Sequence, residues 1–369
     1  MNSGICRLAR IAALIVALAS LGAAADVKGL IKDLFPIPSA TGNEQFLAAK
    51  IAGFLPKNAA LSADNLGGVY LKLGAAASGP AILAGLDEFG YVVSGFTPAG
   101  YLRLDRATPL PSTVYDSFLL GHPVVIMTKT NPAYGVVSQP AMHLLTRERR
   151  DQLAKDLTLD LIFVDLGVRT EAEAKAKGIE ILDPVTFWPD LTPLANEQWS
   201  GPALGQKAVC AALVAAAQEL AKDKTSAADL VWPAQSRFPA RGTRASLGMT
   251  RAKAKLGAKT AIVLDIVAAD WGPNSPLLGK GIVVAQAKEA PSKVREAVEA
   301  AALEKKIPLQ YRTGAESPLL APFVVDGGDA LILGLPVRYA GTPSEIVALK
   351  DVQTLADLIM EIVKEGRLK

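Results

Sequence analysis

The stretch Ala81–Val93, AILAGLDEFGYVV, carries the pattern that decides the fold and raises the main question about function. Its first four residues are apolar, as in a buried strand, and Asp87 and Glu88 follow almost at once. Ligands of α/β enzymes bind beyond the carboxyl ends of strands, so adjacent carboxylates at a strand end mark a candidate site. Gly85, however, offers no side chain at the position closest to the strand end.

Strand-like and helix-like segments alternate along most of the chain. Strands are predicted at 260–270 and 330–340, and periodic helices at 207–222 and 350–366. Such alternation predicts an α/β fold, a three-layer α/β/α domain around a mostly parallel sheet. It would comprise residues 26–94 plus 191–369. Residues 95–190 are instead rich in short strands, prolines and glycines, which predicts an inserted small β-rich domain of a dimerisation or assembly type.

Two helix starts carry capping-box patterns, in which a Thr side chain and a Glu three residues later cap the first turn. The first is Thr41 with Glu44, which predicts a helix from about residue 43. The second is Thr170 with Glu173, which predicts a short helix that ends before Gly178.

The N-terminus has the pattern of a targeting segment. Arg7 and Arg10 precede an apolar run at 11–22, and Ala23–Ala25 fits a cleavage site. We expect residues 1–25 to be a signal peptide and the mature protein to be periplasmic or secreted. A membrane anchor is the alternative, but the run is shorter than the roughly 20 residues that span a bilayer. No later stretch is long and apolar enough, so no membrane association is expected after cleavage.

Charge and cysteine content exclude some functions. The formal net charge is +3, and removal of Arg7 and Arg10 with the targeting segment leaves +1, so a nucleic-acid partner is not expected. Cys210 is the only cysteine outside that segment, so no disulfide can form within the mature chain. Because Cys210 lies in an apolar helical pattern, we interpret it as a core residue and not as a nucleophile.

Seven segments, in this order, resemble the glutamyl-aminopeptidase and deblocking-aminopeptidase family of two-metal metallopeptidases. They are FPIPSATGNE (35–44), DNLGGVYLKLG (64–74), AGLDEFGYVV (84–93), YGVVSQPAMHLL (134–145), LIFVDLGVRTEAEAKAKGI (161–179), TAIVLDIVAAD (260–270) and LPVRYAGTPSE (335–345). The resemblance covers nearly the whole mature chain. It implies a peptidase that uses two divalent ions, such as zinc or cobalt, with a glutamate as general base. It also implies tetrahedral dodecamers.

Carried over position by position, the resemblance places most of the family's functional residues on side chains that cannot perform those roles. Gly85 matches the first metal-binding histidine, Gly205 the bridging aspartate, Ser236 the general base, Arg237 the glutamate ligand, Asp265 the next aspartate and Gly341 the last histidine. Only Asp265 is retained. The two histidines of the chain, His122 and His143, both lie in the inserted segment, so neither can substitute in the α/β domain.

These departures predict a degenerate member with no cofactor. Asp87, Glu88, Arg237 and Asp265 would form a remnant pocket. Arg237 could pair with Asp265 or Asp87 in place of the lost ions, or it could equally be a solvent-facing loop residue. Together with Arg241 and Arg244 it could hold a carboxylate or phosphate, although a solvated loop face is the simpler interpretation.

Three functions remain open from the sequence. The leading hypothesis is an inactive pseudopeptidase that binds peptides, or that assembles with itself or with an active relative. The second is a working metallo-aminopeptidase with a relocated or single-metal site made of Asp87, Glu88, Asp265 and Asp270. The third is a purely structural oligomeric scaffold that makes its contacts through the inserted domain.

Overall fold

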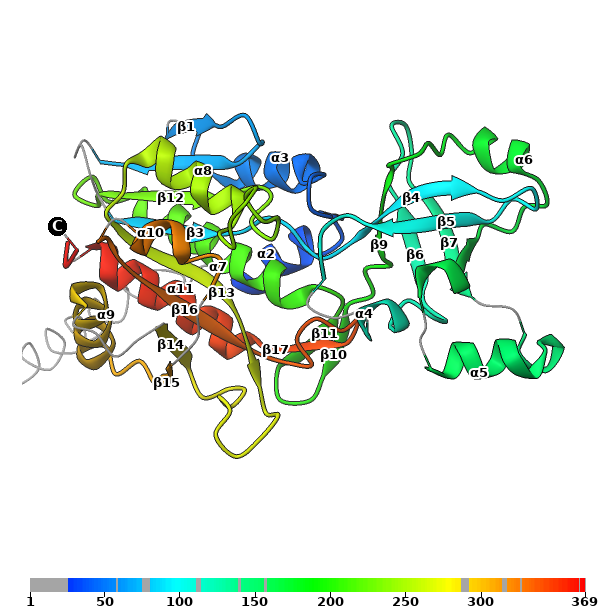
Figure 1. The fold of residues 1–369 in the computed structure, drawn as a ribbon. Coiled ribbons are helices and arrows are strands. Elements are labelled where there is room, and N and C mark those ends of the chain that lie inside the picture. The colour runs from blue at the N-terminus through cyan, green and yellow to red at the C-terminus, as the bar shows by residue number, and fades with distance from the viewer. Residues whose placement is uncertain are drawn as a thin grey trace, which may run out of the picture.

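The computed structural model describes residues 26–369 except 58, 75–79, 111–113, 139–140, 156–157, 287–291, 314–316, 326, 365 and 369. The expected signal peptide, residues 1–25, therefore lies outside the described residues. The described chain forms an α/β domain and a smaller β-barrel, which lie side by side at the left and right of Figure 1. No helix in this part of the chain is long and apolar enough to cross a membrane.

A mixed sheet forms the centre of the α/β domain. Its main path runs in the order β1-β2-β12-β3-β13-β16-β17-β11-β10, and β14 pairs with β16 and with β15. The strands are β1 (Ala60–Ala63), β2 (Val69–Leu73), β3 (Ala81–Ala84), β10 (Thr192–Leu194), β11 (Gln198–Gly201), β12 (Ala228–Trp232), β13 (Thr260–Ala269), β14 (Ile282–Gln286), β15 (Leu309–Thr313), β16 (Asp329–Arg338) and β17 (Glu345–Ala348).

The central strands β12, β3, β13 and β16 run parallel, whereas β2, β17, β11 and β10 pair antiparallel. The expected mostly parallel sheet is therefore parallel only at its centre. All four residues of β3 are buried, because helices cover both faces of the sheet there.

Helices cover the two faces of this sheet unequally. One face packs against α2 (Val27–Leu34), α3 (Gln45–Phe54), α7 (Leu204–Leu220), α9 (Lys293–Glu304) and α11 (Leu349–Lys364). The other packs against α8 (Leu247–Leu256) and α10 (Ala321–Val324). The alanine-rich α7 is buried along nearly its whole length, and its small side chains let it lie between the sheet and its neighbours α2 and α11. The three-layer α/β/α architecture is confirmed.

The inserted segment forms a closed barrel in the strand order β4-β5-β8-β7-β6-β9. Its elements are β4 (Tyr91–Phe96), β5 (Leu102–Arg106), α4 (Val114–Ser117), β6 (Pro123–Ile126), β7 (Ala133–Ser138), α5 (Arg147–Lys155), β8 (Phe163–Asp165), α6 (Glu171–Ala176) and β9 (Pro184–Phe187). Inward-facing apolar residues such as Val93, Val124 and Val164 fill its core. Strand β4 begins four residues before the predicted boundary at 95, and the exact domain limits stay a prediction.

One of the two predicted helix caps is wrong. Helix α3 begins at Gln45 without a side-chain cap, and Thr41 donates instead to Asp87 at 2.9 Å. At α6 the prediction is confirmed, because Thr170 accepts from the backbone of Glu173 at 3.2 Å. The failed cap at Thr41 is informative, since this side chain contributes to the candidate site.

Candidate functional site

The candidate site lies where the carboxyl ends of β3 and β12 meet, beside the N-terminus of α7. Because β12, β3 and β13 are adjacent and parallel, the segments after β3 and β12 emerge at the same edge of the sheet. Asp265 lies within β13, next to this edge. The structure thereby brings together positions that are far apart in the sequence, as the family resemblance requires.

The space beside Gly85 is occupied by the side chain of Ser236. A Cβ built on Gly85 would overlap with Ser236 Oγ and lie 2.8 Å from Ser236 Cβ. Ser236 Oγ donates a hydrogen bond to the fully buried carboxylate of Asp87. A glycine is therefore needed at position 85 as long as Ser236 takes this conformation.

Asp87 fixes the turn that follows β12. Its two carboxylate oxygens accept the backbone N–H groups of Ser236 and Arg237, each at 2.8 Å. Gln235, which precedes them, has φ +54° and donates its N–H to Glu44 at 2.8 Å. Three successive backbone donors thus bind two buried carboxylates, an arrangement that suits negative charge. Asp87 is hydrogen-bonded within the site and is not solvated.

The Arg237 guanidinium lies at the centre of the site. Its Nε donates to the Asp87 carbonyl at 3.1 Å, and Nη2 donates to Gln206 Oε1 at 2.6 Å. Nη2 is also 3.6 Å from Asp265 Oδ1, and the guanidinium lies 5.0 Å from the centre of the Phe89 ring. The side chain is only 15% exposed. Of the two interpretations of Arg237, pairing with Asp265 is the one that the structure shows.

Asp265 is partly buried close to that positive charge. Burial raises the pKa of its carboxyl, and Arg237 opposes this rise. Its side chain keeps 18% of its surface exposed, so it reaches the cavity described below.

The buried carboxylate of Glu345 binds the backbone at the other two glycine positions, Gly205 and Gly341. Glu345 accepts the backbone N–H of Gly205 at 2.9 Å and that of Gly341 at 2.7 Å. A Cβ on Gly205 would lie 2.7 Å from a methyl group of Ile266. Gly341 has φ +81°, and its Cβ would lie 2.5 Å from the ring of Tyr115. Neighbouring side chains thus occupy the space beside all three glycines. Burial raises the pKa of Glu345, against the two backbone hydrogen bonds.

A buried lysine holds the loop before α3 against the site. Lys207 is 1% exposed and donates from Nζ to the carbonyl of Ile37 at 2.7 Å and to Ser39 Oγ at 2.5 Å. Its Nζ is 3.6 Å from Glu88, which also accepts the Ser39 N–H at 2.7 Å. None of these side chains lines the cavity described below, and their hydrogen bonds hold the backbone at Ile37 and Ser39 in place.

Glu44 carries an unusual pKa. Burial, and secondarily the charge of Asp87, raises it to about 7. One oxygen, Oε1, accepts both the Gly42 N–H at 3.0 Å and the Gln235 N–H at 2.8 Å. Cys210 is fully buried with its pKa raised to about 12 by burial, which fits a core residue and excludes a reactive thiolate near neutral pH.

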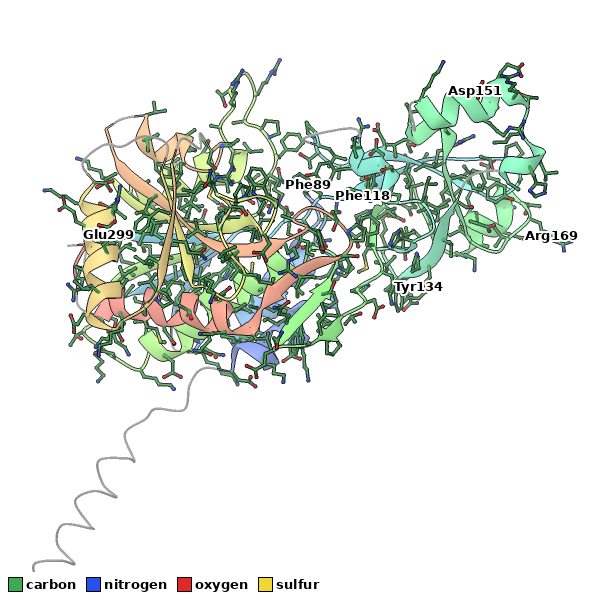
Figure 2. All side chains as sticks on the ribbon, turned by 90° about the horizontal axis from the view of Figure 1, so that it is seen from below. Phe89, Phe118, Tyr134, Asp151, Arg169 and Glu299 are labelled. Atoms are coloured by element: carbon green, nitrogen blue, oxygen red, sulfur yellow. The ribbon has the colours of Figure 1, made fainter. Side chains whose placement is uncertain are left out.

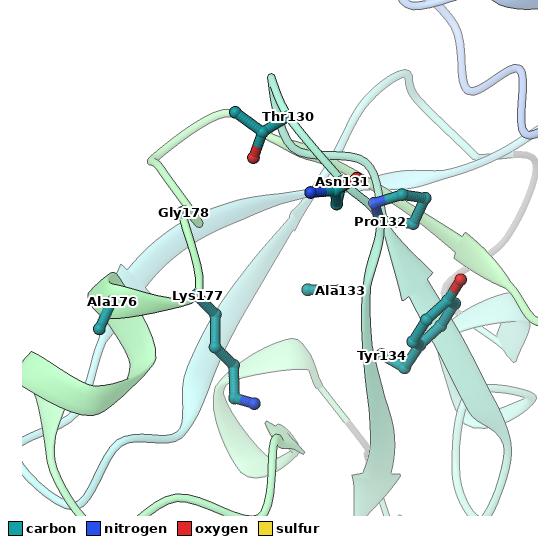
Figure 3. Close-up of a pocket in the computed structure, with 8 residues that line it drawn as sticks. All are labelled: Thr130, Asn131, Pro132, Ala133, Tyr134, Ala176, Lys177 and Gly178. Carbon is teal, nitrogen blue, oxygen red and sulfur yellow. The ribbon is translucent and has the colours of Figure 1, made fainter.

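Two cavities are relevant to ligand binding. A cavity of about 330 Å³ adjoins the site, and its walls include Ser236, Arg237 and Asp265 together with apolar side chains. A second cavity, of about 550 Å³, lies on the barrel, outside the α/β domain (Figure 3). It is lined by Thr130–Tyr134 and Ala176–Gly178 and includes no carboxylate among the described residues. The first is the candidate binding site, because convergent charged groups open into it.

The structure does not assemble the relocated metal site. Asp270 instead pairs with Arg338, with Nε of the arginine 3.0 Å from Asp270 Oδ2. Among the described residues, no three His, Cys, Asp or Glu side chains lie close enough together to hold an ion. Sequence reasoning also missed Thr41, Gln206, Lys207 and Glu345. Charged residues within apolar segments, as at Lys207 and Glu345, could have indicated the last two.

The family profile of the M42 glutamyl aminopeptidases matches residues 67–358. The chain belongs to this family. One curated relative is the lysyl aminopeptidase of Pyrococcus furiosus, which is 26% identical to this chain. The match covers 91% of this chain and 96% of the relative.

Two solved structures show the same fold. The TET aminopeptidase of the archaeon Thaumarchaeota archaeon SCGC AB-539-E09 superposes with a TM-score of 0.80 at 21% identity, over 92% of this chain and 98% of that one. The TET1 peptidase of Pyrococcus horikoshii, described as able to assemble into a tetrahedron or a large octahedral shell, has a TM-score of 0.78 at 21% identity, over 92% and 99%.

Family membership corrects one expectation. We expected no cofactor, but the M42 relatives are metal-dependent aminopeptidases, so the family carries the opposite expectation. The residues at this site do not fit the family's pair of ions, however. Gly85, Gly205 and Gly341 offer no side-chain donor, and Arg237 places a cation 3.6 Å from Asp265.

Proposed function

We propose that this M42-family chain is a pseudopeptidase, which binds peptides or their fragments without hydrolysing them. One observation carries the proposal: the Arg237 guanidinium lies between Gln206 and Asp265, where the family resemblance places a carboxylate ligand. A guanidinium is a cation without an acceptor lone pair, so it cannot replace a carboxylate that binds a metal ion. Ser236, at the base position, donates to Asp87 and makes no hydrogen bond to a histidine or lysine among the described residues.

The test is hydrolysis measured beside binding. Leucyl-p-nitroanilide and short unblocked peptides are incubated with the purified protein, with and without added zinc or cobalt, so that a need for ions does not decide the result. We expect no turnover above buffer, and peptide binding by calorimetry. Turnover that disappears in Asp265→Ala would refute the proposal.

We also propose that the protein is exported by residues 1–25 and lies in the periplasm or outside the cell. The support is the basic, apolar and small-residue pattern of that segment. Mass spectrometry of the secreted or periplasmic protein should find Asp26 at its N-terminus. An intact Met1 in a cytoplasmic fraction would contradict this.

A second proposed role is self-assembly through the barrel. Tyr134 and Trp188 are both partly exposed on the barrel, with ring centroids 5.0 Å apart, and Val136 is exposed on the same strand as Tyr134 (Figure 2 labels Tyr134). Exposed aromatic groups of this kind mark interfaces. Light scattering after size-exclusion chromatography should show an oligomer that Tyr134→Glu weakens. A strict monomer at micromolar concentration would refute the proposed self-assembly. Assembly only in the presence of an active relative would refute it as well.

A further inference from the structure

The cavity beside Arg237 presents two opposite charges that form an ion pair but share no hydrogen bond. Of the five N–H groups of the guanidinium, those on Nε and Nη2 donate to the Asp87 carbonyl and to Gln206. Asp265 lies 3.6 Å from Nη2, which is too far for a hydrogen bond, and no described side chain donates one to it. A donor and an acceptor therefore remain available side by side.

A second positive charge lies at the mouth of this cavity. Arg244 lines the cavity and is exposed, and its guanidinium makes no hydrogen bond or ion pair with the described part of the chain. Counted with Arg237 and Asp265, the charged groups that line the cavity among the described residues are two cations and one anion. This balance favours a ligand that brings a carboxylate, and it retains one site for an ammonium group.

Apart from the hydroxyl groups of Ser236, Ser246 and Ser317, the uncharged walls of the cavity are apolar. They are made by Phe89, Pro109, Leu110, Phe238, Pro318 and Leu319, from the barrel connection, the loop after β12 and the segment before α10. Phe89 lies where the two domains meet (Figure 2). The volume of about 330 Å³ is at the small end of the range for ligand sites. Walls of this kind suit a single apolar side chain.

We infer that this cavity binds a free α-amino acid with an apolar side chain, held as a zwitterion. The carboxylate contacts Arg237 and Arg244, the ammonium contacts Asp265, and the side chain packs on the apolar walls. The inference rests on the proposed function, because it names the ligand of the same non-hydrolytic site.

Adjacency of the charges separates a free amino acid from a peptide. In an α-amino acid the ammonium and the carboxylate are attached to one carbon, so they can meet Asp265 and Arg237 together. The N-terminus of a peptide has no carboxylate there, and the C-terminus has no ammonium. Either peptide end would leave one buried charge of the cavity without a partner, which weakens binding.

The test is calorimetric titration of the full chain with a matched ligand series. L-leucine and L-phenylalanine should bind, and glycine should bind much more weakly. L-leucinamide lacks the carboxylate and N-acetyl-L-leucine lacks the ammonium, so each should bind about tenfold or more weakly than leucine. If either binds as tightly as leucine, the zwitterion inference is wrong.

Three variants test the assigned contacts. Asp265→Asn keeps the shape of the side chain and should weaken leucine about tenfold or more without changing the affinity for N-acetyl-L-leucine. Arg244→Gln should weaken both ligands. Arg241→Gln is the control, because Arg241 is exposed on the same loop but does not line the cavity. An equal effect of Arg241→Gln would show that general loop charge, and not this cavity, governs binding.

The dipeptide leucyl-leucine, titrated in the same way, separates the two proposals. If it binds as tightly as leucine or more tightly, the free-amino-acid inference fails and the peptide-binding function stands. If leucine appears in that sample by mass spectrometry, the chain hydrolyses peptides and the proposed function fails. If no ligand of the series binds, the inference is overturned whatever the outcome of the hydrolysis assay.

Discussion

Gly85→Ala tests whether the side chain of Ser236 determines the glycine at position 85. The added Cβ would overlap with Ser236 Oγ and lie 2.8 Å from its Cβ, and the hydrogen bond to Asp87 holds Ser236 in place. Overpacking of a buried site costs about 1–3 kcal/mol, so we expect the free energy of unfolding to fall by that amount. The backbone at Gly85 has no positive φ, so conformational strain does not contribute.

A double-mutant cycle isolates this contact. Ser236→Gly alone loses a hydrogen bond to a charged group, worth about 1.5–3 kcal/mol. In that background Gly85→Ala should cost less than about 0.5 kcal/mol, because the colliding atoms are gone. Urea unfolding followed by circular dichroism measures all four proteins. Gly53→Ala is the control, since a Cβ there meets nothing within 4 Å, and in helix α3 it should stabilise by up to about 1 kcal/mol. The reasoning is refuted if Gly85→Ala costs the same in both backgrounds.

Three further perturbations test the surrounding network. Lys207→Met should lower the free energy of unfolding in urea by about 3–5 kcal/mol, because it leaves Glu88 buried without its cation. Glu88→Gln in the same chain should recover part of this loss. A loss below about 1 kcal/mol would contradict the stabilising role of Lys207. Glu44 has a folded pKa of about 7 against an ordinary value of 4.5, so the folded state retains a proton that the unfolded state releases between these values. Stability should therefore fall as pH rises from 4.5 to 7, by at most about 3 kcal/mol, and Glu44→Gln should flatten this profile; equal slopes in the two proteins would count against it. Gly341→Ala should lose about 1–2 kcal/mol from its φ of +81° and more from contact with Tyr115, and an unchanged urea midpoint would disprove both causes.

Much of the fold could be predicted from the sequence because its determinants are local. The apolar run of β3 and the periodic pattern of α7 each identify a buried element without reference to the rest of the chain. The antiparallel edges of the sheet could not be predicted in this way. Strand direction depends on which segments pair, and a pattern such as that of β17 is the same in either direction.

In the candidate site, too, the sequence predicts which residues take part but not the long-range contacts that they make. The sequence located Asp87 through its position beyond a strand end, and it located Arg237 and Asp265 through the family resemblance. It could not choose between a paired and a solvated Arg237, because that depends on Gln206, which a helix brings in from elsewhere. It likewise assigned Thr41 to a helix cap, since the competing acceptor on Asp87 is 46 residues away. Contacts of this range follow only from the assembled fold.

The short connection between β3 and β4 has a mechanical consequence. Glu88 and Ala40 form a β-bridge, and Gly90 packs so closely on Ala40 that a Cβ would lie 2.6 Å from its methyl group. Phe89, between them, contributes to the cavity wall, and Tyr91 already belongs to the barrel. These contacts hold the connection in place between the two domains and favour a rigid segment over a flexible one. A displacement of the barrel that moved this connection would therefore also move Phe89 and the cavity wall that it forms.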